Sequence, residues 1–113
     1  PITEWFFWIK KSKDAKPLFK RNQMSFMKNI IRIPPDTKNN HPAPFPLSLA
    51  NNFLLGCTDE GGVVYDPYMG SGTTAIASVM NNRKYIGSEI SDTYCALARK
   101  RIAEHQAQQV FKF

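Results

Sequence analysis

The order of hydrophobic and polar residues predicts helices and strands that alternate along the second half of the chain. Between Pro46 and Gly56, apolar residues recur every three or four positions, as in a helix that starts at a proline and stops at a glycine. The apolar positions of this helix are Leu47, Leu49, Ala50, Phe53 and Leu54. After the glycine pair at 61–62, the apolar run 63–65 predicts a short buried strand.

The alternation continues toward the carboxyl end. Beyond a glycine turn, residues 74–80 predict a helix that ends at two asparagines, and residues 84–90 predict a second strand. Ser91 is a suitable N-cap for a last helix. The apolar stripe of that helix is Tyr94, Leu97, Ala98 and Ile102, whereas Arg99, Lys100 and Arg101 are expected to face mostly water. Strand, helix, strand and helix with short links form a βαβα unit, which implies an α/β fold with a parallel sheet.

The first part of the chain has a less regular pattern. Residues 4–11 are rich in aromatics and end in charge, which predicts a strand, and residues 29–33 predict another. Residues 34–46 contain five prolines in thirteen positions and predict a loop.

The distribution of charge separates the first third of the chain from the rest. The net charge of +6 lies entirely in residues 1–40, with nine Lys or Arg against three acids, whereas residues 41–113 hold six of each sign. Cations interleaved with aromatic rings can bind phosphates and stack on bases, although they also suit the solvated face of a core. The candidate nucleic-acid contacts are Lys10, Lys11, Lys13, Lys16, Lys20 and Arg21.

Composition narrows the class of protein. Cys57 and Cys95 lack a C-x-x-C spacing, so we expect reduced thiols in a cytoplasmic protein. His41 and His105 have no neighbouring ligand residues, so no metal site is expected. No apolar run approaches the roughly 20 residues that span a bilayer, and no membrane partner is expected. Because Pro1 is not preceded by an initiator methionine, we expect an excerpt of a longer chain.

The segment that follows the first predicted strand of the βαβα unit, D-P-Y-M-G-S-G at 66–72, is a candidate ligand site. Ligands of doubly wound sheets bind beyond the carboxyl ends of the strands. Gly70 and Gly72 allow backbone N–H groups to approach a ligand without an intervening side chain. Glu89 ends the next predicted strand, where a carboxylate can accept hydrogen bonds from both hydroxyls of a ribose. The ligand is therefore expected to contain an adenosine-like ribose.

The identity of that ligand depends on Asp66. Residues 70–75 fit the G-x-G-x-x-[GA] pattern of dinucleotide sites, but there the glycines follow the strand directly. Here residues 66–69 intervene, and a carboxylate at Asp66 would repel a pyrophosphate. An acid suits the ammonium and sulfonium of S-adenosylmethionine. A P-loop is excluded because no Gly-Lys-Ser/Thr follows, and a tight turn with no ligand is the remaining alternative.

Residues 41–102 resemble the carboxy-terminal portion of bacterial and phage DNA amino-methyltransferases, the N6-adenine and N4-cytosine enzymes whose cofactor motif follows the catalytic one. D-P-Y-M-G-S-G-T-T is similar to their D-P-F-x-G-S-G-T-T motif, with Tyr68 in place of phenylalanine. H-P-A-P-F-P at 41–46 resembles the segment before that motif, and Y-I-G-S-E-I at 85–90 the ribose-binding strand. The resemblance implies a partial Rossmann-like S-adenosylmethionine-dependent methyltransferase fold, a βαβα unit with preceding strand and loop segments.

The resemblance also implies two segments of the chain with different functions. Residues 1–40 would be a basic, aromatic-rich, DNA-facing segment at the end of the target-recognition region, and residues 41–113 the cofactor-binding part. Asp66 would engage the methionine ammonium, Tyr68 would pack beside the cofactor, and Glu89 would bind the ribose. The implied cofactor contacts are Asp66, Pro67, Tyr68, Gly70, Ser71, Gly72, Thr73, Thr74, Glu89, His41, Pro42 and Phe45.

A catalytic motif of this family is missing from the sequence. The family holds its flipped base with a [D/N/S]-P-P-[Y/F/W] tetrapeptide, but the only Pro-Pro here lies in I-P-P-D at 33–36. The fragment therefore has no catalytic residue of its own, and we expect it to be inactive without an upstream catalytic segment or a partner chain.

The resemblance implies a site-specific DNA methyltransferase of the restriction–modification type. Its methyl donor would be S-adenosylmethionine and its acceptor the exocyclic amine of adenine or cytosine in double-stranded DNA; a homodimer is left open. The alternatives are a non-catalytic nucleic-acid-binding remnant and a methyltransferase acting on RNA or a small amine.

Overall fold

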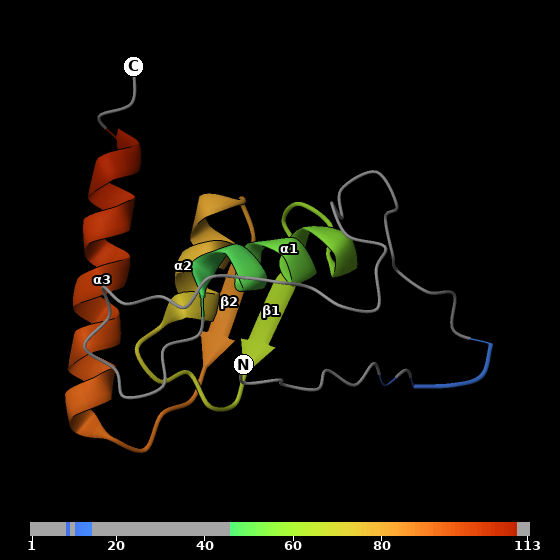
Figure 1. The fold of residues 1–113 in the computed structure, drawn as a ribbon, viewed down its shortest axis with the longest axis horizontal. Helices are drawn as coiled ribbons and strands as arrows, with labels where there is room; N and C mark the ends of the chain where they lie inside the picture. Colours follow the sequence, from blue (N-terminus) through green and yellow to red (C-terminus); the bar gives the residue numbers. More distant parts are fainter. Residues whose placement is uncertain (1–8, 10, 15–45, 111–113) are drawn as a thin grey trace, which may run out of the picture.

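The computed structural model describes Ile9, residues 11–14 and residues 46–110. Its elements, in chain order, are α1 (Leu47–Cys57), β1 (Val63–Asp66), α2 (Thr73–Met80), β2 (Lys84–Gly87) and α3 (Asp92–Val110). The two strands are parallel and pair from Val63 opposite Lys84 to Asp66 opposite Gly87, and their arrows point the same way in Figure 1. The predicted βαβα unit and its parallel sheet are therefore confirmed.

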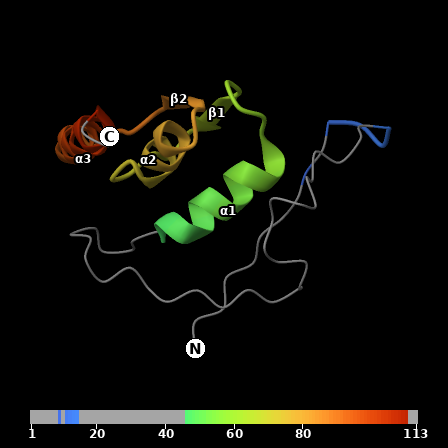
Figure 2. The same ribbon diagram turned by 90° about the horizontal axis from the view of Figure 1, so that it is seen from above.

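Helices α1 and α2 cover one side of the sheet, and the other side carries no described element (Figure 2). Side chains alternate between the two faces of a strand. Val64 accordingly packs against the buried cluster that α1 and α2 form, whereas Val63 and Tyr65 are 58% and 62% exposed. The expectation of a buried strand at 63–65 therefore holds for Val64 but is wrong for Val63 and Tyr65, because within the described residues only one face of the strand meets a helix.

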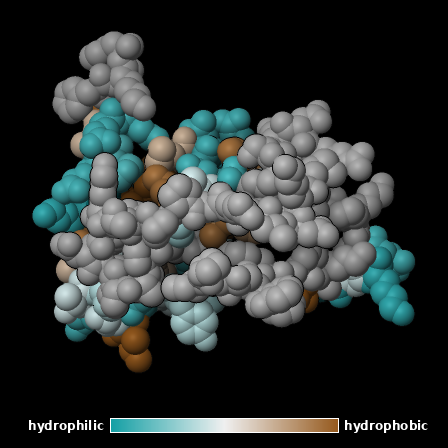
Figure 3. Space-filling model, viewed as in Figure 1, coloured by the Kyte–Doolittle hydropathy of each residue, from teal (hydrophilic) through white to brown (hydrophobic). Residues whose placement is uncertain are grey.

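The core centres on α2. Its residues Ala75, Ile76 and Ala77 are fully buried. Met69, from the loop between β1 and α2, joins Ile76 of α2 and Ile102 of α3 in one hydrophobic cluster. The loop that precedes α2 is thus anchored in the core, while the hydrophilic residues of α3 form the left-hand edge of the molecule in Figure 3.

The element ends follow the predicted caps in part: α1 begins at Leu47, directly after Pro46, but runs through the predicted stop at Gly56 to Cys57. Ser91 caps α3, since its Oγ accepts the N–H of Tyr94 at 3.3 Å. Helix α3 continues to Val110, well past the predicted apolar stripe. Strand β2 ends at Gly87 and not at residue 90, because the carbonyl of Ser88 accepts the N–H of Met69 from the loop, at 2.9 Å.

Most expectations for residues 1–45 lie outside the described residues. Ile9 and Lys11, from the predicted strand at 4–11, are in no strand. The rest of that strand, the strand at 29–33 and the proline-rich loop up to residue 45 are not among the described residues. Within the part that is described, no helix is long and apolar enough to cross a membrane.

Arg83 ties the turn between α2 and β2 to the end of α1. Its Nε donates to Thr58 Oγ1 at 3.1 Å, its Nη2 to the Thr58 carbonyl at 2.9 Å, and its Nη1 to the Asn81 carbonyl at 2.6 Å. We expect Arg83→Met to lower the free energy of unfolding by about 1–3 kcal/mol, because these acceptors lose a charged donor while the apolar stem is kept. Urea unfolding measures the loss. Lys84→Met, at the exposed neighbouring position, is the control and should change little; equal midpoints for the two variants would contradict the prediction.

Candidate functional site

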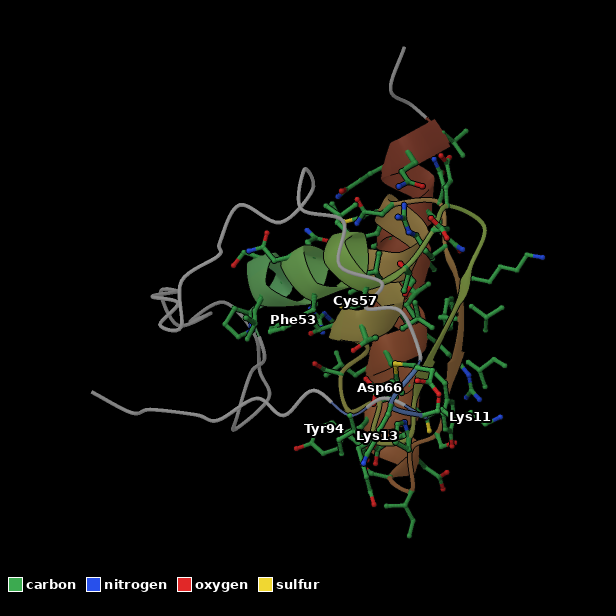
Figure 4. The ribbon with its side chains drawn as sticks, turned by 90° about the vertical axis from the view of Figure 1, so that its right-hand side faces the viewer. Lys11, Lys13, Phe53, Cys57, Asp66 and Tyr94 are labelled. Carbon is green, nitrogen blue, oxygen red and sulfur yellow. The ribbon has the colours of Figure 1, made fainter. Side chains whose placement is uncertain are left out.

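The candidate site lies where both strands end. The loop at 67–72 leaves β1 at that edge of the sheet, and Asp66, labelled in Figure 4, is the last residue of β1. Asp66 is half-buried, and its Oδ1 accepts the backbone N–H of Tyr68 at 3.0 Å. Among the described residues no hydrogen bond reaches its second oxygen, Oδ2. One oxygen therefore shapes the turn, and the other is available to a ligand.

Strand β2 holds the start of this loop in place. Beyond the sheet register, the N–H of Ser88 donates to the Asp66 carbonyl at 3.0 Å, and the N–H of Met69 donates to the Ser88 carbonyl at 2.9 Å. The side chain of Met69 lies across Gly87, where an added Cβ would overlap Met69 Cε and stand 3.1 Å from Cγ and Sδ. The absence of a side chain at Gly87 thus lets the loop lie against the strand.

The carboxylate of Glu89 bridges the two loops at this edge. Its Oε2 accepts the N–H of Gly70 at 2.9 Å, and its Oε1 accepts the N–H of Ser91 at 2.9 Å. The first bond fixes the β1–α2 loop and the second fixes the β2–α3 loop. Glu89 is therefore held in one orientation by backbone donors on both of its oxygens.

The two glycines of the loop have structural reasons to be glycine. Gly70 and Gly72 have φ of 54° and 85°, in the left-handed region that side chains disfavour. A Cβ at Gly72 would lie 3.0 Å from the Cβ and 3.2 Å from the Cα of Ala98, so its absence also lets α3 approach. The N–H of Gly70 donates to Glu89 and that of Gly72 to the Met69 carbonyl, at 3.0 Å. These two N–H groups are thus already bonded within the chain, and the approach of the loop's backbone to a ligand stays a prediction.

Arg101 is the member of this site that the sequence prediction missed. Its Nη1 donates to the carbonyl oxygen of Ser71 at 2.6 Å and to Ser71 Oγ at 2.7 Å. The expectation that Arg101 faces water like Arg99 and Lys100 is wrong: those two are exposed, whereas Arg101 is half-buried. The signal was present, since Arg101 follows Ala98 of the apolar stripe by three positions and therefore lies on the same side of the helix.

The other implied cofactor contacts differ in exposure. Tyr68 is 88% exposed and Pro67 is also exposed, whereas Thr74 is half-buried. Ser71 and Thr73 are each 6% exposed. His41, Pro42 and Phe45 are outside the described residues, as are Lys10, Lys16, Lys20 and Arg21; Lys11 and Lys13 are exposed.

Neither cysteine belongs to a metal cluster in the described part of the chain, which contains no group of three or more His, Cys, Asp or Glu suited to a metal ion. Cys57 lies on α1 near Phe53 (Figure 4), and burial raises the pKa of its thiol. Cys95 Sγ donates to the backbone carbonyl of Glu89 at 3.5 Å, which adds a weak support to the position of that residue.

Comparison with known proteins identifies the family. Residues 1–100 match the N6/N4 methyltransferase family, described as DNA methylase. The chain belongs to this DNA methylase family. The orphan methyltransferase M.BamHII of Bacillus amyloliquefaciens is 46% identical over 85 residues, covering 68% of this chain and 32% of M.BamHII. Type II methyltransferase M2.MboI of Moraxella bovis is 32% identical over 113 residues, covering 90% of this chain and 41% of M2.MboI. The chain therefore spans about a third to two fifths of these relatives' length.

A solved structure supports the same assignment of the fold. M1.HpyAVI, in its complex with S-adenosylmethionine, is similar with a TM-score of 0.66 at 34% sequence identity, covering 77% of this chain and 44% of M1.HpyAVI. The predicted partial Rossmann-like methyltransferase fold and the predicted family are thus confirmed.

Proposed function

We propose that this chain supplies the S-adenosylmethionine-binding part of a DNA methyltransferase that methylates the exocyclic amine of adenine (N6) or cytosine (N4). One observation carries the proposal. Two carboxylates, Asp66 and Glu89, lie at the carboxyl ends of adjacent parallel strands, on either side of the loop that contains Gly70 and Gly72. Ligands of such sheets bind at this edge, and a pair of acids there suits a ligand with cationic groups and a ribose.

Asp66 fits the methionine end of the donor. Its Oδ2 carries no hydrogen bond within the described residues, so it can accept one from the ammonium group of the ligand. Its negative charge also favours the sulfonium and disfavours a pyrophosphate, which supports S-adenosylmethionine over a nicotinamide dinucleotide.

Glu89 fits the ribose. A carboxylate has about four lone-pair positions, two on each oxygen. The backbone N–H groups of Gly70 and Ser91 orient the carboxylate at the edge of the sheet where ligands of such folds bind, so its oxygens are placed to accept hydrogen bonds from ribose hydroxyls. Because the bound N–H groups already fix the carboxylate, little freedom is lost when the ribose binds.

The structure supports the remaining implied cofactor contacts to different degrees, according to how exposed each side chain is. The exposed ring of Tyr68 is free of described neighbours on most of its surface and can pack beside the cofactor. Ser71 and Thr73 offer a ligand little surface, and we assign them to the support of the loop. Pro67, Thr74 and the segment 41–46 stay proposed contacts on the strength of the family alone.

Asp66→Asn tests the proposal in the protein at its natural full length. Asparagine keeps an Oδ1 that accepts the Tyr68 N–H but loses the charge, so we expect binding of S-adenosylmethionine to weaken by about 1–3 kcal/mol, roughly fivefold to 150-fold in Kd. Titration calorimetry measures it. Asp59→Asn, at an exposed position before the start of β1, makes the same chemical change at the opposite end of the strand and should leave Kd unaltered. Binding of a nicotinamide dinucleotide in place of S-adenosylmethionine would refute the proposed ligand.

The acceptor side of the reaction rests on the family. In such enzymes the target base is flipped out of the duplex into the active site, and no [D/N/S]-P-P-[Y/F/W] tetrapeptide occurs among these 113 residues. We therefore propose that the tetrapeptide comes from another segment or a partner chain, and that these residues alone transfer no methyl group. The Lys and Arg residues within positions 1–40, which include the exposed Lys11 and Lys13, support DNA as the partner. Methyl transfer to duplex DNA by the full-length protein supports this acceptor; transfer to RNA alone, or none, favours the alternatives.

A further inference from the structure

Arg101 joins the third helix to the glycine loop through a single peptide group. Nη1 of Arg101 donates to the carbonyl oxygen of Ser71 at 2.6 Å and to Ser71 Oγ at 2.7 Å. The acceptor residue is 6% exposed, so water competes little for these bonds. Hydrogen bonds from a guanidinium are charge-assisted and stronger than neutral ones. The Arg101–Ser71 hydrogen bonds are therefore expected to be stronger than those of a solvent-exposed ion pair.

The bonded peptide group is fixed at both of its ends. The carbonyl of Ser71 and the N–H of Gly72 belong to the same planar unit. Arg101 holds the carbonyl, and the N–H donates to the Met69 carbonyl at 3.0 Å. Two peptide groups earlier in the loop, Glu89 holds the N–H of Gly70 at 2.9 Å. Arg101 and Glu89 thus restrain the backbone next to the two glycines of the loop, Gly72 and Gly70.

Such restraint matters most at glycine. Glycine loses more conformational freedom on ordering than any other residue, and here both glycines have a positive φ. A loop that is ordered before the ligand arrives does not have to be ordered by it, which raises affinity. Helix α3 reaches this loop twice, since Ala98 stands against Gly72 one turn before Arg101.

We propose that Arg101 is a positioning residue for cofactor binding, which holds the Ser71–Gly72 peptide in the conformation that receives the amino-acid part of S-adenosylmethionine. The inference rests on the proposed function. It assigns to Arg101 an effect mainly on the amino-acid end of the ligand, since Arg101 donates to Ser71, whereas Glu89, which we propose for the ribose, is oriented by the N–H groups of Gly70 and Ser91. A merely structural role would affect both ends alike.

The test compares two ligands on the full-length protein by calorimetry. S-Adenosylmethionine contains the amino-acid part, and 5′-methylthioadenosine lacks it. For Arg101→Met, which keeps an apolar stem and removes the donor, we expect the Kd of S-adenosylmethionine to rise about tenfold and that of 5′-methylthioadenosine by less than about twofold. Lys100→Met removes the same charge at an exposed neighbouring position and should change neither value.

Each outcome decides the proposal. Arg101→Lys keeps a charged donor on a stem one bond shorter and should restore part of the lost affinity. Equal weakening of both ligands, or no weakening of S-adenosylmethionine, overturns the positioning role. If Arg101→Met does not fold, Arg101→Lys decides by the same selective loss at smaller size. Failure of the unsubstituted protein to bind S-adenosylmethionine refutes the proposed function itself, and is thereby distinguished from failure of this inference.

Discussion

Gly72→Ala should lower the free energy of unfolding by about 2–5 kcal/mol and abolish measurable cofactor binding. Two costs combine. An alanine at φ 85° is strained by about 1–2 kcal/mol, and its Cβ would be 3.0 Å from the Cβ of Ala98, an overpacking that costs about 1–3 kcal/mol. Relief of the clash requires α3 to move away, and Arg101 would then lose its contact with Ser71. Urea unfolding and calorimetric titration measure the two effects.

Gly61→Ala separates the two costs. Gly61 has φ 78°, close to that of Gly72, but a Cβ built there meets no atom within 4 Å. Its substitution should therefore show the backbone strain alone, about 1–2 kcal/mol. Equal losses at the two glycines would mean that the approach of α3 to Gly72 adds nothing to stability.

Glu89→Gln is expected to lower stability and cofactor affinity nearly as much as Gly72→Ala, although glutamate and glutamine side chains have the same shape. Both carboxylate oxygens accept a backbone N–H, and an amide has only one oxygen. Its NH₂ group must then face the N–H of either Gly70 or Ser91, which leaves a donor unsatisfied at a cost of about 1–3 kcal/mol. We expect a lower unfolding midpoint without any ligand, and a loss of S-adenosylmethionine affinity of roughly tenfold to a hundredfold.

Glu60→Gln is the matched control for that change. Glu60 is exposed, and its Oε1 accepts the Asn82 Nδ2–H at 2.8 Å, a bond that a glutamine oxygen can keep. It should leave both the unfolding midpoint and the affinity unaltered. If Glu89→Gln is as stable in the absence of ligand as Glu60→Gln, the carboxylate does not hold the two loops together.

The secondary structure of residues 46–110 was largely predictable from local patterns. Period and caps defined the helices, with Ser91 at the start of α3 as the sharpest signal. The exposure of Val63 and Tyr65 was not predictable, because an apolar run shows that a strand can be buried and does not show which faces have a covering layer. The end of β2 was missed because Ser88 bonds to a loop residue that is distant in sequence.

The two acids of the candidate site were predictable from the sequence, whereas most of its hydrogen bonds were not. The positions of Asp66 and Glu89 after two parallel strands placed them at one edge of the sheet, and the register agrees. What the sequence could not show is that the loop's N–H groups are taken up by Glu89 and Met69, since hydrogen-bond partners depend on side-chain geometry. Arg101 was missed for a different reason: three consecutive basic residues look alike in sequence, although a helix directs each to a different side.

The burial of Met69 bears on how this protein withstands oxidants. Oxidation to the sulfoxide makes a flexible apolar side chain polar, and at Met69 the added oxygen would be forced against Gly87 and the core. Met69 is only 9% exposed, whereas Met80, at the end of α2, is 42% exposed. Of these two methionines, Met80 is therefore expected to react with peroxide first, whereas packing in the core shields the thioether of Met69.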